Sequence, residues 1–196
     1  MPIIHVNAGD RLPPTLNLDG DDGPVIVMVH GYKYAPGHAT ECPHRHIFAL
    51  DPARDCFKVV SWPRGLGFDG RRSGEGLAIG FGWNARGSLW RAYDEAARAG
   101  AALAEMVAAI RARAPHRPVH AIAHSFGARV VLSALAHLAP GALGRIILLA
   151  GAEFGHHAGA ALATPAGRAA EIVNVTTREN DLFDALLEWL IPAPAR

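Results

Sequence analysis

Five short, almost continuously apolar runs limit what this chain can fold into more than any other feature of its sequence. They cover residues 24–30, 57–62, 119–124, 145–150 and 171–177, and a shorter run at 3–6 suits an edge strand. Each run has the length of a strand and lacks the alternation of a strand with one solvated face. We therefore expect strands that are buried on both faces of a parallel sheet.

Segments with helical spacing separate these runs. The clearest covers residues 88–115, where Tyr93, Leu103, Ile110 and other apolar or small residues mark one face and Pro115 ends the helix. Strands that alternate with helices predict an α/β fold, a doubly wound and mostly parallel sheet in a three-layer αβα arrangement, with the active site at the carboxyl ends of the strands. Residues 63–87 are glycine-rich and lack periodicity, which predicts a long rim loop.

Composition restricts the classes of partner. The 196 residues fit a single domain, 1–196, and a net charge of +1 gives no reason to expect nucleic acid or an anionic membrane surface as partner. The two cysteines, Cys42 and Cys56, fit no redox or zinc spacing and are expected as free thiols, and the nearby His44 and His46 add only a weak indication of metal. We expect a cytoplasmic protein without cofactor or metal, and the sequence leaves its oligomeric state open.

A serine stands at one junction between an expected strand and an expected helix. The stretch "AHSFG" differs from the G-x-S-x-G nucleophile elbow only in Ala123 at the first glycine position, and both Ala123 and Gly127 are small enough for the tight turn. Such a turn raises the hydroxyl of Ser125 above the sheet and places the N–H of Phe126 at a helix N-terminus. Ser125 is the candidate nucleophile, although a small-residue turn with an idle serine is the alternative.

Two further parts of a catalytic site have candidates. Gly31 lets the chain turn after the first strong strand, so the N–H of Tyr32 can serve as a second oxyanion donor beside that of Phe126, while His30 is expected to brace the loop. Asp181 follows the last strand and is our choice for the acid that orients a histidine. Glu179 and Asp184 are alternatives, and Asp181 could instead cap the helix that follows.

These residues resemble the α/β-hydrolase superfamily, and more narrowly a family of uncharacterised bacterial serine hydrolases of that fold. The matching stretches are "VHGY", "SWPRG", "YDEAARAGAALAEMV", "AHSFGARVV" and "TTRENDLFDALL", in order along nearly the whole chain. The resemblance implies Ser125 as nucleophile, Tyr32 and Phe126 as oxyanion donors, and Asp181 as the acid.

The histidine that this fold places beyond the acid is missing. After Asp181 the sequence continues with "LFDALLEWLIPAPAR", which contains no histidine, and the last strand and helix of the fold are expected to be missing too. Because a serine without a base is a weak nucleophile, three explanations stay open. The histidine lies beyond Arg196, which we favour; His156 or His157 in "EFGHHAG" substitutes; or the domain has no activity.

The leading hypothesis is a serine hydrolase that cleaves a small-molecule carboxylic ester through an acyl-enzyme on Ser125, without a cofactor. The alternative is a catalytically inactive α/β-hydrolase domain that binds a ligand or partner at the same place.

Overall fold

A computed structural model of the chain describes residues 3–18, 23–52, 60–72 and 74–176. Its strands are β1 (Ile3–Asn7), β2 (Val25–Val29), β3 (Leu77–Gly82), β4 (Val119–His124), β5 (Arg145–Leu149) and β6 (Glu171–Val175). Its helices are the 3₁₀ turn η1 (Pro43–Arg45), α1 (Trp62–Gly65), α2 (Leu89–Arg113), α3 (Phe126–Ala134), α4 (Gly155–Leu162) and α5 (Pro165–Ala169). The expected strands at 3–6, 24–30, 119–124, 145–150 and 171–177 are thus present, with ends that differ by two residues or fewer.

The described strands form one six-stranded sheet in the order β1-β3-β2-β4-β5-β6. Every neighbouring pair is parallel, which confirms the predicted sheet type. The chain moves from β2 outward to β3 in one direction and then, through α2, to β4 on the other side of β2. This reversal makes the sheet doubly wound, and in such sheets ligands bind at the carboxyl ends of the strands where the order reverses, here β2 and β4.

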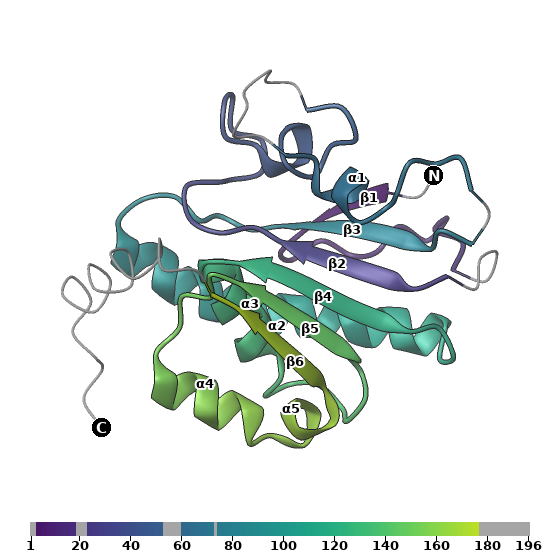
Figure 1. Ribbon diagram of the computed structural model, residues 1–196. Coiled ribbons are helices and arrows are strands. Elements are labelled where there is room, and N and C mark those ends of the chain that lie inside the picture. The colour runs from purple at the N-terminus through teal and green to yellow at the C-terminus, as the bar shows by residue number, and fades with distance from the viewer. Residues whose placement is uncertain (1–2, 19–22, 53–59, 73, 177–196) are drawn as a thin grey trace.

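Helices lie on both sides of the sheet (Figure 1). The two faces of the sheet contribute to two hydrophobic cores, and the residues of β2 alternate between them. Val25, Val27 and Val29 belong to the larger core beneath α2 and α3. Met28 belongs to a second core with Phe48 and Phe68. In that second core Trp62 of α1, together with Ile47 and Phe48, covers the other face of the sheet near β3 and β2. The predicted three layers are present.

The predicted long loop at 63–87 is wrong in its central part. Leu77–Gly82 form β3, in which every residue is buried. The glycines of this segment predict a loop, but in the structure Gly80 and Gly82 allow close packing. A Cβ at position 80 would lie 2.8 Å from Cδ2 of Phe48, and a Cβ at position 82 would lie 2.6 Å from Nε2 of His44. The segment before β3 also contains α1, whose first turn is capped by the Ser61 hydroxyl.

The predicted strand at 57–62 lies mostly outside the described residues. Its last part is not a strand, because Ser61 is the N-cap of α1 and Trp62 is the first residue of that helix. Val60 is 63% exposed, unlike a residue of a strand buried on both faces. The strand that flanks β2 is therefore β3, which follows this segment in the chain.

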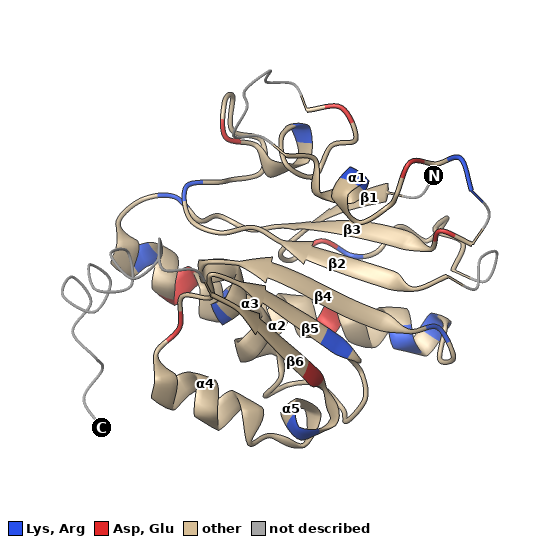
Figure 2. Ribbon diagram, viewed as in Figure 1, with Lys and Arg blue, Asp and Glu red and all other residues tan. Residues whose placement is uncertain are grey.

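Charged residues of both signs occur on both sides of the sheet (Figure 2). Among the described residues, no helix is long and apolar enough to cross a membrane.

Candidate active site

Ser125 lies between the end of β4 and the start of α3, in a strained backbone conformation. Its φ is 53° and its ψ is −125°, a left-handed φ that side chains other than glycine rarely adopt. The backbone is fixed on both sides: the Ser125 N–H donates to the Leu149 carbonyl oxygen at 3.0 Å, and the Ser125 carbonyl accepts from the N–H groups of Ala128 at 2.9 Å and Ala152 at 3.1 Å. This is the strand-to-helix turn that the sequence predicts.

Small residues around Ser125 are required by close backbone contacts. A Cβ at position 127 would lie 2.5 Å from the carbonyl oxygen of Val29 and 2.7 Å from that of His30. A Cβ at position 31 would lie 2.8 Å from Cβ of Ser125 itself. The turn after β4 and the turn after β2 are thus in direct contact, because β2 and β4 are neighbours in the sheet.

Two backbone donors lie in these adjoining turns. The N–H groups of Tyr32 and Phe126 make no hydrogen bond to the residues that the structure describes, and neither does the Ser125 hydroxyl. Phe126 is the first residue of α3, where a backbone N–H has no partner within the helix. The rings of Tyr32 and Phe126 are in edge contact, with centroids 6.0 Å apart. Their amides are available for a developing negative charge near Ser125.

His30 holds the turn after β2 against the end of β3. Its Nδ1–H donates to the Gly31 carbonyl oxygen at 2.9 Å, its Nε2 accepts from the Trp83 N–H at 3.1 Å, and the Trp83 indole N–H donates to the His30 carbonyl oxygen at 2.9 Å. The side chain is fully buried, and this burial lowers the pKa of His30 to about 3. The neutral ring uses both nitrogens for bracing, as the sequence suggests, so neither nitrogen is free to take a proton from Ser125 or a substrate.

The loop that carries Tyr32 is also tied to the segment after β3. The Tyr32 hydroxyl donates to the Gly87 carbonyl oxygen at 2.6 Å, and the N–H of Lys33 donates to the Ala85 carbonyl oxygen at 2.9 Å. Lys33 adopts a φ of 76°, in the left-handed region. Residues that follow β2, β3 and β4 therefore meet at one edge of the sheet.

The sequence matches one known protein family. Residues 15–148 match the model of a family described as α/β hydrolase of unknown function (DUF900). The chain belongs to this α/β hydrolase family. No curated protein matches the sequence.

Two solved structures resemble this α/β hydrolase in fold. One is a cutinase from Trichoderma reesei in complex with a phosphonate inhibitor, with 12% identity and a TM-score of 0.43 over 82% of this chain and 65% of the cutinase. The other is an acetyl xylan esterase, with 8% identity and a TM-score of 0.44 over 86% of this chain and 94% of the esterase. The α/β hydrolase chain thus spans about two thirds of the cutinase's length.

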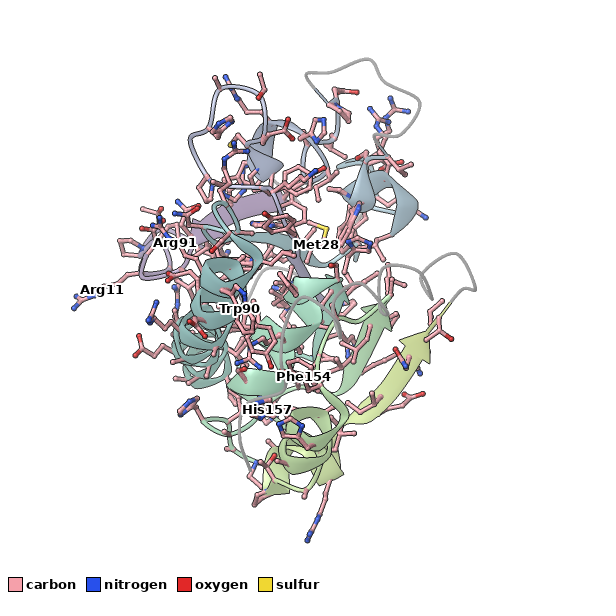
Figure 3. The ribbon with its side chains drawn as sticks, turned by 90° about the vertical axis from the view of Figure 1, so that its left-hand side faces the viewer. Arg11, Met28, Trp90, Arg91, Phe154 and His157 are labelled. Atoms are coloured by element: carbon pink, nitrogen blue, oxygen red, sulfur yellow. The ribbon has the colours of Figure 1, made fainter. Side chains whose placement is uncertain are left out.

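The two candidate substitute bases of the α/β hydrolase lie in the first turn of α4. The His156 ring stacks on Phe154 with centroids 5.8 Å apart, and the His157 ring lies 4.1 Å from that of His156. Figure 3 shows Phe154, His157 and Trp90 on one side of the molecule. Neither histidine is hydrogen-bonded to Ser125. Asp181, with its alternatives Glu179 and Asp184, lies outside the described residues.

The residues that carried the weak indication of metal have other partners. His44 Nε2 donates to Oδ1 of Asn7 at 2.7 Å, and His46 Nδ1 lies 3.0 Å from the Tyr34 hydroxyl. Burial and the neighbouring His5 lower the pKa of His44 to about 4. Cys42 is a buried free thiol. Within the described residues, no group of three or more His, Cys, Asp and Glu side chains is arranged to hold a metal ion.

One polar cluster beside the α/β hydrolase site was not predicted from the sequence. Arg129 of α3, Glu153 of the turn after β5 and Tyr93 of α2 form a buried hydrogen-bonded group. An arginine inside the apolar run "ARVVLSAL" was a signal for it, since a buried guanidinium needs a carboxylate partner. No local pattern in the sequence indicates which carboxylate pairs with Arg129.

Proposed function

We propose that this α/β hydrolase is a serine esterase that cleaves small carboxylic esters through an acyl-enzyme on Ser125. The conformation of Ser125 carries the proposal. A non-glycine residue with φ of 53° at a strand-to-helix turn, held by three backbone hydrogen bonds, is costly for a residue with no task. Ser125 lies in the same two adjoining turns as the amides of Tyr32 and Phe126, which make no hydrogen bond to the described residues, and acyl transfer needs such donors.

The reaction follows from these groups. Ser125 Oγ attacks the ester carbonyl carbon, a bond forms between Oγ and that carbon, and the carbonyl oxygen becomes an oxyanion that accepts hydrogen bonds from the N–H groups of Tyr32 and Phe126. The bond to the alcohol oxygen then breaks, and the alcohol leaves with the proton taken from Oγ. A water molecule then attacks the acyl carbon, one of its protons passes to Oγ as the bond between Oγ and that carbon breaks, and the carboxylic acid is released.

The proposed proton carrier is a histidine oriented by Asp181. Our first choice is a histidine encoded beyond Arg196, and His156 and His157 are the candidates within the chain. Whichever of these histidines is the base, it would take the proton from a Ser125 hydroxyl that the backbone already positions. No metal or organic cofactor is part of the proposal.

Active-site labelling tests the proposal. The folded protein, both as the 196-residue chain and as its complete native reading frame, is incubated with a fluorophosphonate, and the labelled residue is identified by mass spectrometry. We expect labelling at Ser125 and none in Ser125→Ala. A His156→Ala/His157→Ala double variant that labels at the wild-type rate places the base elsewhere. A folded complete protein without label at Ser125 would overturn the esterase and favour the ligand-binding domain.

A further inference from the structure

A buried ion pair lies one helical turn beyond Ser125. Arg129 on α3 and Glu153 in the turn after β5 approach to 2.7 Å, and their side chains are only 11% and 5% exposed. Charges buried to this degree rarely stabilise a fold more than apolar side chains of similar volume would, because desolvation offsets their attraction. The position of this pair beside a strained serine suggests that it fixes the local backbone geometry.

Hydrogen bonds link Arg129, Glu153 and Tyr93 to one another. Nη1 of Arg129 donates to both carboxylate oxygens of Glu153, at 2.9 and 2.7 Å, and Nε donates to the Tyr93 carbonyl oxygen at 2.8 Å. Glu153 Oε1 also accepts from the Tyr93 hydroxyl at 2.7 Å and from the Phe154 N–H at 2.8 Å. The Glu153 carboxylate thus joins α2, α3 and the turn after β5.

The cluster is directly connected to both halves of the candidate site. Glu153 follows Ala152, whose N–H donates to the Ser125 carbonyl oxygen, and the same turn begins at Leu149, which accepts from the Ser125 N–H. On the other side, the Tyr93 ring is in edge contact with the ring of Phe126, with centroids 6.0 Å apart. A shift of Glu153 therefore reaches both the serine backbone and the residue that carries one oxyanion donor.

We propose that Glu153 is a positioning residue for Ser125, which acts through Arg129, Tyr93 and the 149–153 turn to hold the serine in line with the amides of Tyr32 and Phe126. The part of this inference that concerns catalysis rests on the proposed esterase function. Its structural half, that Glu153 holds the backbone of the elbow, can be tested independently.

Two variants separate positioning from stability. Glu153→Gln removes the charge and leaves Arg129 buried without its partner. The double variant Arg129→Met/Glu153→Met replaces the pair with apolar side chains of similar length, which is expected to keep the protein folded. Glu171→Gln is the matched control, because it breaks an exposed ion pair with Arg145, 2.8 Å long, at the opposite end of the same strand β5.

The first readout is amide hydrogen exchange of Ser125 and Ala152, resolved by NMR. In both Glu153 variants we expect exchange at least about tenfold faster than in the wild type, with no change in Glu171→Gln. The second readout is the rate of fluorophosphonate labelling at Ser125. We expect a loss of about 10- to 100-fold, because small misplacements of reacting groups have effects of that size. Melting temperatures measured in parallel show that the double variant is folded.

The outcomes are distinct. Unchanged exchange of both amides in the Glu153 variants overturns the inference, whether or not the wild type is labelled. Faster exchange with an unlabelled wild type refutes the esterase and retains the link between Glu153 and the elbow. A double variant that is folded, exchanges faster and still labels at the wild-type rate overturns the positioning role.

Discussion

Single residues decide whether the candidate site can form, and Gly31 shows how. No side chain fits there, because a Cβ would lie 2.8 Å from Cβ of Ser125 and 2.9 Å from the His124 carbonyl oxygen. These are contacts with the backbone and with a short side chain that cannot turn away. The absence of a side chain at position 31 therefore sets the separation between the turn that carries Tyr32 and the serine.

Gly31→Ala is expected to impair Ser125 more than it impairs the fold. The added methyl group pushes the turn after β2 away from Ser125, which separates the Tyr32 amide from the hydroxyl. We expect fluorophosphonate labelling to slow by about 10- to 100-fold and the free energy of unfolding to fall by about 1–3 kcal/mol. Both are measured on the same preparations, by mass spectrometry and by urea denaturation.

Gly65→Ala is the control for this prediction. Gly65 ends α1, and nothing lies within 4 Å of the Cβ that alanine would add. Its labelling rate should equal that of the wild type, and its stability should change by less than about 0.5 kcal/mol. Equal labelling rates in Gly31→Ala and Gly65→Ala would contradict the contact between the two turns.

At the scale of secondary-structure elements, the packing of α2 against α3 positions the candidate site. Gly100 in the middle of α2 allows a close approach, since a Cβ there would lie 2.6 Å from Cβ of Ser133 and 2.8 Å from the Val130 carbonyl oxygen. Helix α3 begins directly after Ser125 and ends near Ser133. The distance between the two helices thus limits where the N-terminus of α3 can lie.

We predict that Gly100→Ala lowers the free energy of unfolding by about 1–2 kcal/mol, although alanine is the better helix former by about 1 kcal/mol. The reason is that the two helices must separate to admit the methyl group. Chemical denaturation measures the change. Gly159→Ala in α4 is the control, because that site is open and the substitution should stabilise by up to about 1 kcal/mol. A stabilised Gly100→Ala would show that the helices are not in tight contact.

At the scale of the whole molecule, the buried His30 links two central strands, and its burial predicts that the fold loses stability in acid. His30 connects the end of β2 to the end of β3 through Nε2, which accepts from the Trp83 N–H, and its Nδ1–H donates to the Gly31 carbonyl oxygen in its own turn. Its pKa is lowered from 6.5 to about 3, chiefly by burial, so the folded protein keeps the ring neutral where the unfolded chain protonates it.

The pH dependence of the free energy of unfolding tests whether His30 stays neutral in the folded protein. Between pH 6.5 and about 3 the unfolded state binds one more proton at His30 than the folded state does, so stability falls as the pH falls. His30 alone should contribute a slope of up to about 1.4 kcal/mol per pH unit. Urea denaturation at several values between pH 7 and pH 4 should show a slope smaller by about this amount in His30→Asn. Parallel curves for the two proteins would place His30 in a solvated position.

The limits of prediction from sequence are clearest at β3. Its sequence "LAIGFG" contains glycines that indicate a loop locally, but Gly80 and Gly82 are there because Phe48 and His44 occupy the space of their side chains. Those contacts join residues more than thirty positions apart, so no local pattern carries them. The Arg129–Glu153 pair escaped prediction for the same reason, because its two partners come from different elements.

The sequence by itself determined the type of sheet, the strand β4 at Val119–His124, the long helix α2 and the turn at Ser125, because these depend on periodicity and residue size within one segment. The tertiary structure alone decided which strand flanks β2, which turn adjoins the serine and which carboxylate pairs with Arg129. It places β2 beside β4, with Val29 opposite Ala123, although their sequences lie some ninety residues apart. That pairing brings Gly31 and Tyr32 to Ser125, because neighbouring parallel strands end at the same edge of a sheet.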